Sequence, residues 1–260
     1  MFGLPGLKEL NMIVAAIAGV ITLIFTTLLT IAGVGAAFIL IPVFIALGID
    51  VHVAMATALL LNSIAMICAS YRFIKNGLVM WKVAIPILIV ATALSPLGAY
   101  ASIGLNREVL MWLFVAFLLF AAGMMLFYKP VQRNLESSKS KELISGVSVG
   151  VFAGFLGGLL GVGGGNFIVP VLVWLGYNPK KASATASFIV IFSSFSGFLG
   201  HATVGNISAQ LLGFAAVGSA IGAIVGAWLM TEKLKREHVK LIIGIVLIGI
   251  AAKMIWNLLN

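Results

Sequence analysis

Apolar runs long enough to span a membrane alternate with short polar stretches along the whole chain. Several of these runs approach or exceed the roughly 18–20 residues that cross a bilayer as a helix. The pattern therefore predicts an all-α polytopic membrane protein. The expected apolar segments are 11–31, 36–47, 51–71, 83–103 and 108–128 in the first half, and 143–160, 165–175, 182–199, 209–230 and 241–258 in the second.

A glycine-rich break interrupts the apolar pattern once in each half. Residues 161–166 read Gly-Val-Gly-Gly-Gly-Asn and are followed by Pro170, whereas residues 33–38 read Gly-Val-Gly-Ala-Ala-Phe and are followed by Pro42. The breaks are 128 residues apart, and eleven of the 26 residues from 33 to 58 equal their partner at that offset. The chain is therefore predicted to be a duplicated unit, with a first transmembrane repeat at 1–128, a basic linker at 129–142 and a second repeat at 143–260.

The distribution of Lys and Arg favours one path of the chain through the membrane. Residues 11–47 would reach about 55 Å as one straight helix, too long for a hydrocarbon core of about 30 Å. If each break is the tip of a hairpin, re-entrant or made of two short crossings, each half is a broken-helix hairpin plus three transmembrane helices, and the halves are inverted repeats. The polar segments 72–82, 129–142, 177–181 and 231–240 then share one face with 13 of the 16 Lys and Arg residues. The positive-inside rule makes that face cytoplasmic and places both termini outside.

Composition agrees with this class of protein. Hydrophobic residues make up 62% of the chain and charged residues 9%, whereas about a quarter of an average soluble domain is charged. The net charge of +9 is attributed to basic loops, so the lipid bilayer is the expected partner and nucleic acid is not. The single cysteine, Cys68, excludes an internal disulfide. No cofactor or metal site is predicted, and no nucleophile–base pair marks an enzyme.

The breaks are the candidate binding site. A glycine break frees backbone N–H groups that lipid cannot satisfy, so these groups must face protein, water or a ligand. The N-terminus of each short arm carries partial positive charge and unpaired donors, which favour an anion. Discontinuous helices in inverted repeats bind substrates near the membrane midplane in many secondary transporters. The residues predicted to form this site are Gly33, Gly35 and Ala36 in the first half and Gly163, Gly164, Gly165 and Asn166 in the second.

Polar residues on the helices that follow the short arms are candidates to complete the site. Thr57 and Thr185 are repeat partners, and Asn62 and Ser187 lie on the same two predicted helices, with Ser183 nearby. Their hydroxyl and amide groups offer donors to an oxyanion. The alternative is structural, because Ser and Thr in membrane helices also bond to their own backbone or to neighbouring helices.

The positions of the acidic residues bear on the kind of solute. All seven, Glu9, Asp50, Glu108, Glu136, Glu142, Glu232 and Glu237, fall in predicted loops or at the ends of predicted helices. Cation pathways and proton relays usually need a carboxylate inside the membrane. The sequence therefore favours an anion or a neutral solute.

The glycine pattern resembles that of a known family. The residues that carry the resemblance are Gly161, Gly163, Gly164, Gly165 and Pro170, the partial copy Gly33, Gly35 and Pro42, and the run Ala184-Thr185-Ala186-Ser187. They are similar to the TauE/SafE family of membrane transporters, also called sulfite exporters, and the likeness extends over nearly the whole chain. It implies export of sulfite, or movement of organosulfonates or other sulfur anions, across the bacterial inner membrane. Ala36, Ala37 and Phe38 stand where the second copy has Gly164, Gly165 and Asn166, so the two half-sites are unequal.

Three functions remain open at this point. The leading hypothesis is a secondary transporter that exports a small sulfur-containing anion by alternating access. A passive anion channel could have the same architecture, and a membrane partner or assembly protein that transports nothing is a third reading. Gly218, Gly222 and Gly226 form a glycine stripe on 209–230, a spacing that lets a neighbouring helix approach closely. A homo-oligomer is compatible with all three functions, because glycine stripes that face lipid and those that face a partner look alike in sequence.

Overall fold

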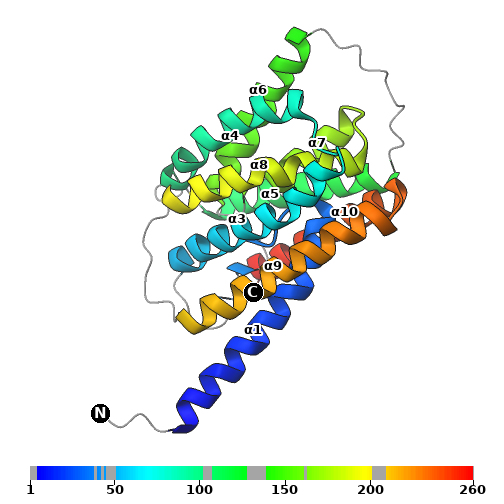
Figure 1. Ribbon diagram of the computed structural model, residues 1–260. Coiled ribbons are helices and arrows are strands. Elements are labelled where there is room, and N and C mark those ends of the chain that lie inside the picture. Colours follow the sequence, from blue (N-terminus) through cyan, green and yellow to red (C-terminus); the bar gives the residue numbers. More distant parts are fainter. Residues whose placement is uncertain are drawn as a thin grey trace.

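The computed structural model describes residues 5–37, 40–41, 44, 51–101, 107–127, 139–160, 163–200 and 209–259. Every regular element in these residues is a helix (Figure 1). The first half contains α1 (Pro5–Ala32), α3 (Val51–Lys75), α4 (Trp81–Ala101) and α5 (Arg107–Phe127). The second half contains α6 (Lys139–Leu159), α7 (Gly165–Trp174), α8 (Pro179–Gly200), α9 (Ala209–Trp228), the π-helical turn η1 (Leu229–Lys233) and α10 (Arg236–Leu259).

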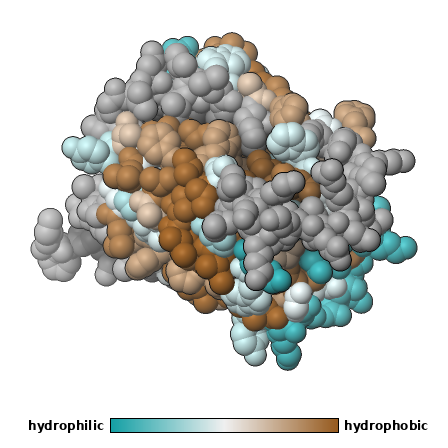
Figure 2. All heavy atoms as spheres, turned by 90° about the horizontal axis from the view of Figure 1, so that it is seen from above, coloured by the Kyte–Doolittle hydropathy of each residue, from teal (hydrophilic) through white to brown (hydrophobic). Residues whose placement is uncertain are grey.

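These helices confirm the predicted all-α membrane fold. Within the described residues, five helical stretches are long and apolar enough to cross a bilayer. They are Val53–Lys75, Trp81–Ala101, Pro179–Gly200, Leu212–Lys233 and Glu237–Leu259. Figure 2 shows hydrophobic residues spread across the middle of one face, with hydrophilic residues gathered at one edge.

Several helices begin earlier than the apolar pattern predicts, and at α8 a polar capping group explains the extension. Helix α8 was expected from residue 182 but begins at Pro179. Proline suits the first position of a helix, and the Asn178 side chain accepts a hydrogen bond from the N–H of Lys180 at 2.9 Å, as an N-cap does. Helix α6 begins at Lys139, inside the predicted linker. The rest of that linker, up to residue 138, lies outside the described residues.

The first glycine break is the C-terminal cap of α1. The N–H of Val34 donates to Leu29 O and the N–H of Gly33 donates to Thr30 O, both at 3.1 Å. This pair of bonds is the Schellman motif, whose capping residue adopts a left-handed conformation that glycine accepts without strain. Gly33 has a φ of 72°, as this motif requires. Gly77 ends α3 in the same way, with a φ of 63°.

The most extensive helix contacts join the two halves of the chain. Helix α1 packs along α9, and α6 packs along α4. At Gly226 a β-carbon would overlap the carbonyl oxygen of Thr27, and at Gly98 it would overlap that of Phe155. Gly98 is the repeat partner of Gly226, and Phe155 is the repeat partner of Thr27, each at the 128-residue offset. The two contacts are therefore equivalent in the two halves. The predicted glycine stripe on 209–230 is thus confirmed as a site of close helix approach, and its partner is α1.

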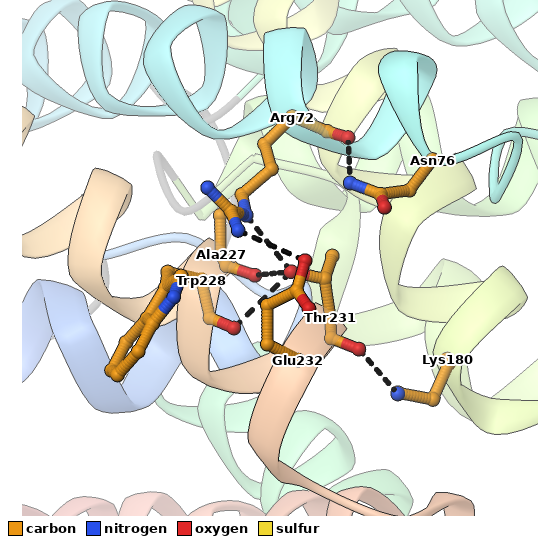
Figure 3. A network of polar contacts seen from close by, with 7 residues as sticks. All are labelled: Arg72, Asn76, Lys180, Ala227, Trp228, Thr231 and Glu232. Carbon is orange, nitrogen blue, oxygen red and sulfur yellow. Dashed lines mark hydrogen bonds and ion pairs between the residues drawn. The ribbon is translucent and has the colours of Figure 1, made fainter.

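Three basic segments predicted to share one face are in contact. Arg72 at the end of α3 donates to Thr231 Oγ1 at 2.9 Å and pairs with Glu232 at 3.0 Å, both in η1. Lys180 in the first turn of α8 donates to the carbonyl oxygen of Thr231 at 3.1 Å. Figure 3 shows Arg72 and Lys180 approaching this turn from different helices. The segments 72–82, 177–181 and 231–240 therefore lie at the same end of the bundle.

Candidate functional site

The first break is held against α8, a helix of the second half. The Ser183 hydroxyl donates to the carbonyl oxygen of Ala32 at 3.1 Å. A β-carbon at Gly33 would lie 2.5 Å from the α-carbon of Ser183, so a larger residue cannot occupy this position without moving the helix. The contact fixes the end of α1 beside the predicted site helix of the other half.

The second break leads directly into α7. Gly163 has a φ of 72°, and its N–H donates to Gly157 O at 3.2 Å. The N–H groups of Phe167 and Ile168 both donate to Gly164 O at 3.1 Å, which closes the first turn of α7. Gly164 is the N-cap residue and has no side chain to accept from the first N–H groups of the helix that follows. The first N–H groups of α7 are therefore left for another acceptor.

The two breaks meet in the buried centre of the molecule. A β-carbon at Gly165 would lie 2.8 Å from Val34 O and 2.9 Å from Gly33 O. The N-terminus of α7 thus lies against the backbone that ends α1, although the two segments are about half the chain apart. Gly163, Gly164 and Gly165 are all buried. The structure therefore brings together the glycines that the sequence placed in one site.

Asn62 of α3 connects the two breaks. Its Oδ1 accepts a hydrogen bond from the N–H of Ala36 at 2.8 Å, and its Nδ2 donates to Ser194 Oγ of α8 at 2.9 Å. A β-carbon at Gly35 would overlap the Asn62 amide, and one at Gly163 would lie 2.7 Å from Ser194 Oγ. Asn62 is fully buried. Its amide group therefore caps the first short arm and reaches the helix beside the second break.

Asn166 differs from Asn62 because its amide has no partner. It is the second residue of α7 and is fully buried. Neither Nδ2 nor Oδ1 makes a hydrogen bond in the structure. Buried polar groups are nearly always paired, so an unpaired amide in a native fold calls for a specific explanation. Asn166 is the most unusual polar group at the breaks.

The predicted hydroxyl residues are used for other contacts. The Thr57 hydroxyl donates to Val53 O at 2.8 Å and the Ser187 hydroxyl donates to Ser183 O at 2.9 Å, both within their own helices. Thr185 Oγ1 accepts from the N–H of Met80 at 3.0 Å, which fixes the turn before α4. None of these hydrogen bonds involves the breaks. A role of Thr57, Thr185 and Ser187 in binding stays a prediction.

Ser194 belongs to the same cluster but was missed by sequence reasoning. It lies in an apolar stretch between Phe192 and Phe195, and its repeat partner at the 128-residue offset is Met66. The duplication therefore gave no signal for it. Two adjacent serines inside an expected membrane helix were the available sign, because hydroxyl groups at that depth need partners.

The cluster is polar but carries no charge. Among the residues whose burial the structure describes, every buried polar side chain is Ser, Thr or Asn. Glu108, Glu232 and Glu237 are exposed. An arrangement of amide, hydroxyl and backbone groups can hydrogen-bond a small solute or an ion, but it supplies no base or nucleophile activated by a neighbour.

Comparison with known proteins identifies the family. The family model described as "Sulfite exporter TauE/SafE" matches residues 14–254. The chain belongs to the TauE/SafE family. This family consists of membrane transporters, in agreement with the apolar helices and the glycine breaks.

Relatives of similar length support this assignment. The "Probable membrane transporter protein YunE" of Bacillus subtilis is 27% identical, over 92% of this chain and 96% of its own length. The "Probable membrane transporter protein MJ0441" of Methanocaldococcus jannaschii is 25% identical, over 93% of this chain and 92% of its own length. A plant relative, "Sulfite exporter TauE/SafE family protein 1" of Arabidopsis thaliana, is 32% identical over 38% of this chain and 22% of its own length. No solved structure matches this TauE/SafE chain.

Proposed function

We propose that the protein is a secondary transporter that exports a small sulfur-containing anion, such as sulfite or an organosulfonate, across the bacterial cytoplasmic membrane. The anion is held where the two breaks meet, between the N-termini of the short arms. One observation carries this proposal: a β-carbon at Gly165, at the start of α7, would lie within 3 Å of the carbonyl oxygens of Gly33 and Val34, at the end of α1, so the two breaks are close together.

The physical basis is the N-terminus of α7. Its first N–H groups have no intrahelical acceptor, Gly164 supplies no side-chain cap, and the helix dipole adds partial positive charge there. Gly163 and Gly164 carry no side chain that would shield the backbone from a ligand, and in this conformation Ser194 Oγ and Ala153 O lie beside the positions of their missing β-carbons. The charge-free surroundings suit an anion that must bind and leave again, because a buried Lys or Arg would hold it far more strongly.

Alternating access requires two halves that can rock against a shared site. The paired contacts Gly226–Thr27 and Gly98–Phe155 support an inverted repeat, because each half packs its first helix against the other half in the same way. The contacts between Arg72, Lys180 and η1 support a single basic face. By the positive-inside rule this face is cytoplasmic, which places both termini outside.

Counterflow in proteoliposomes tests the proposal. Vesicles containing the purified protein are loaded with unlabelled sulfite, and labelled sulfite is added outside with chloride, sulfate or an organosulfonate as competitor. We expect saturable, transient accumulation of label that one or more sulfur anions suppress. A conductance without saturation or counterflow would indicate a passive channel. A flat trace for every sulfur anion, from protein shown to be folded, would refute anion transport.

A further inference from the structure

The unpaired amide of Asn166 indicates which form of the ligand the site takes. This inference extends the proposed function and rests on it. An asparagine side chain is both a donor, through Nδ2, and an acceptor, through Oδ1. In this structure both atoms are buried and unpartnered. A ligand that pairs only one of them would leave the other unsatisfied, which is costly in a buried site.

The position of Asn166 in α7 directs its side chain toward the break. Cα–Cβ bonds tilt toward the N-terminus of a helix, and Asn166 follows the first residue of α7, Gly165. The tilt brings its amide toward the N-terminal end of α7, and Gly165 at that end is the residue that meets Gly33 and Val34. Donors from α7 and acceptors from the end of α1 lie together at this point. A small ligand bound there would meet both kinds of group.

The ligand that matches this set has oxygen acceptors and one O–H donor. We propose that Asn166 selects the protonated monoanion of a weak oxyacid, such as hydrogensulfite, over anions that carry no O–H. The Nδ2 group of Asn166 and the first N–H groups of α7 donate to the charged oxygens. The ligand O–H donates to Asn166 Oδ1. An oxyanion without a proton would instead place a charged oxygen against that carbonyl oxygen.

Charge favours the same form of the ligand. The buried polar residues of the described chain are all neutral, so no buried cation compensates a second negative charge. The cost of moving an ion out of water rises steeply with its charge, and neutral donors offset only part of it. A monoanion is therefore accepted where a dianion of the same acid is rejected.

This choice of ligand also accounts for how a proton can cross without a relay in the protein. A transported monoanion carries its own proton, and the proton is lost to water when the acid ionises on the other side. Among the residues whose burial the structure describes, no carboxylate or histidine is buried that would otherwise carry it. Export of the weak acid then responds to a pH gradient without any titrating group in the site.

Ionisable groups of the surrounding helices do not share the site. The last turn of α1, next to the break that meets Gly165, carries no charged residue. The helices that pack along α7 are α5, α6 and α8. Their charged residues stand in the first turns: Arg107 and Glu108 of α5, Lys139, Lys141 and Glu142 of α6, and Lys180 and Lys181 of α8. A pH dependence of binding is therefore assigned to the ligand.

Binding of two probes across pH tests the inference. Sulfite and methanesulfonate, a monoanion of similar shape without an O–H, are titrated into the full chain in lipid nanodiscs between about pH 6 and about pH 8. If only the monoanion binds, the apparent Kd for sulfite rises about tenfold for each pH unit above the pKa of hydrogensulfite. Methanesulfonate should bind at least about tenfold more weakly at the lower pH, with no dependence on pH. The methanesulfonate titration also reports any titrating group of the protein.

The variant Asn166→Leu, which keeps the volume and removes both polar atoms, should bring the affinities for the two probes together. Thr92→Val, at another buried and unpartnered polar group, should leave their ratio unchanged. Equal binding of both probes, or a flat pH profile for sulfite, by the wild-type protein would overturn the selection and leave anion transport standing. Failure of every anion to bind would remove the proposed function itself. The wild-type comparison stands even if the Asn166 variant does not fold.

Discussion

The side-chain nitrogen of Asn62 lies 2.9 Å from the hydroxyl oxygen of Ser194, 132 residues further along the chain. The oxygen of the same amide accepts the N–H of Ala36. One side chain of α3 thus holds the first short arm and contacts the helix beside the second break. Any movement of α8 relative to the first break must stretch or break one of these two bonds.

Replacing Asn62 with leucine should destabilise the protein and impair anion binding. The change removes two buried hydrogen bonds and leaves the Ala36 N–H without an acceptor, which costs about 1–3 kcal/mol. Thermal unfolding of the purified protein measures the loss. The control is Ser63→Ala, next to it on α3, which removes one bond to Ile191 O and leaves the breaks intact. An Asn62→Leu protein that is as stable as Ser63→Ala and binds normally would contradict this role.

Alanine at Gly35 should be far more harmful than alanine at Gly77. Both glycines have positive φ, 81° and 63°, so each substitution costs about 1–2 kcal/mol in backbone strain. Gly77 has open space around its missing side chain, whereas a β-carbon at Gly35 overlaps the Asn62 amide. Gly77→Ala should therefore retain sulfite counterflow and Gly35→Ala should lose it. Similar effects of the two changes would show that strain alone matters at the break.

Leucine at Asn166 should make the unliganded protein more stable while weakening binding. The substitution removes a buried amide that has no partner, and relief of that penalty is about 1–3 kcal/mol. We expect a higher unfolding temperature without sulfite and a smaller increase when sulfite is added. A lower unfolding temperature in the unliganded variant would mean that the amide is satisfied in the native protein.

The ion pair between Arg72 and Glu232 should contribute little to stability. The two side chains are 34% and 49% exposed, so solvent screens their attraction. A double-mutant cycle with Arg72→Ala and Glu232→Ala should give a coupling energy of about 0–1 kcal/mol that decreases at high salt. A contact this weak can open without a large barrier during transport. A coupling above that range, insensitive to salt, would instead make the basic end a rigid part of the fold.

Alanine at Gly98 and alanine at Gly226 should cause similar losses. Each β-carbon would overlap a backbone carbonyl oxygen of the facing helix, and the two helices would have to separate, at about 1–3 kcal/mol. A β-carbon at Gly249 of α10 would have no neighbouring atom within 4 Å. Gly249→Ala should therefore be neutral or stabilising by up to about 1 kcal/mol, as helix propensity predicts. Losses that differ widely between positions 98 and 226 would argue against equivalent packing in the two halves.

The sequence predicted the helices and the breaks well, because both are local properties. Runs of apolar residues predicted the ends of the described helices to within six residues, whereas most of the predicted segment 36–47 lies outside the described residues. The glycines at 33, 35 and 163 marked positions with positive φ. The packing partner of each helix was harder to predict, because an apolar surface does not specify which neighbouring helix covers it. The glycine stripe at 218, 222 and 226 indicated close approach, but only the structure identified α1 as the partner.

The side chains at the site were predicted unevenly for a related reason. Asn62 and Asn166 stood out because an amide is costly in a membrane helix and needs a use. The hydroxyls of Thr57 and Ser187 were less informative, since a carbonyl oxygen one turn earlier can satisfy each of them. Ser194 accepts a hydrogen bond from Asn62, and no local pattern predicts a contact across 132 residues.

The exchange of first helices between the halves has an evolutionary consequence. Helix α1 covers α9, and α6 covers α4, so neither half encloses its own glycine faces. A single repeat on its own would expose those faces to lipid unless a second copy packed beside it. Gene fusion would then have converted an intermolecular dimer into one polypeptide. The unequal residues at the breaks, Ala36 opposite Gly164 for example, are substitutions that a chain with two copies of the unit can accumulate independently in each half, whereas a symmetric dimer of one copy cannot.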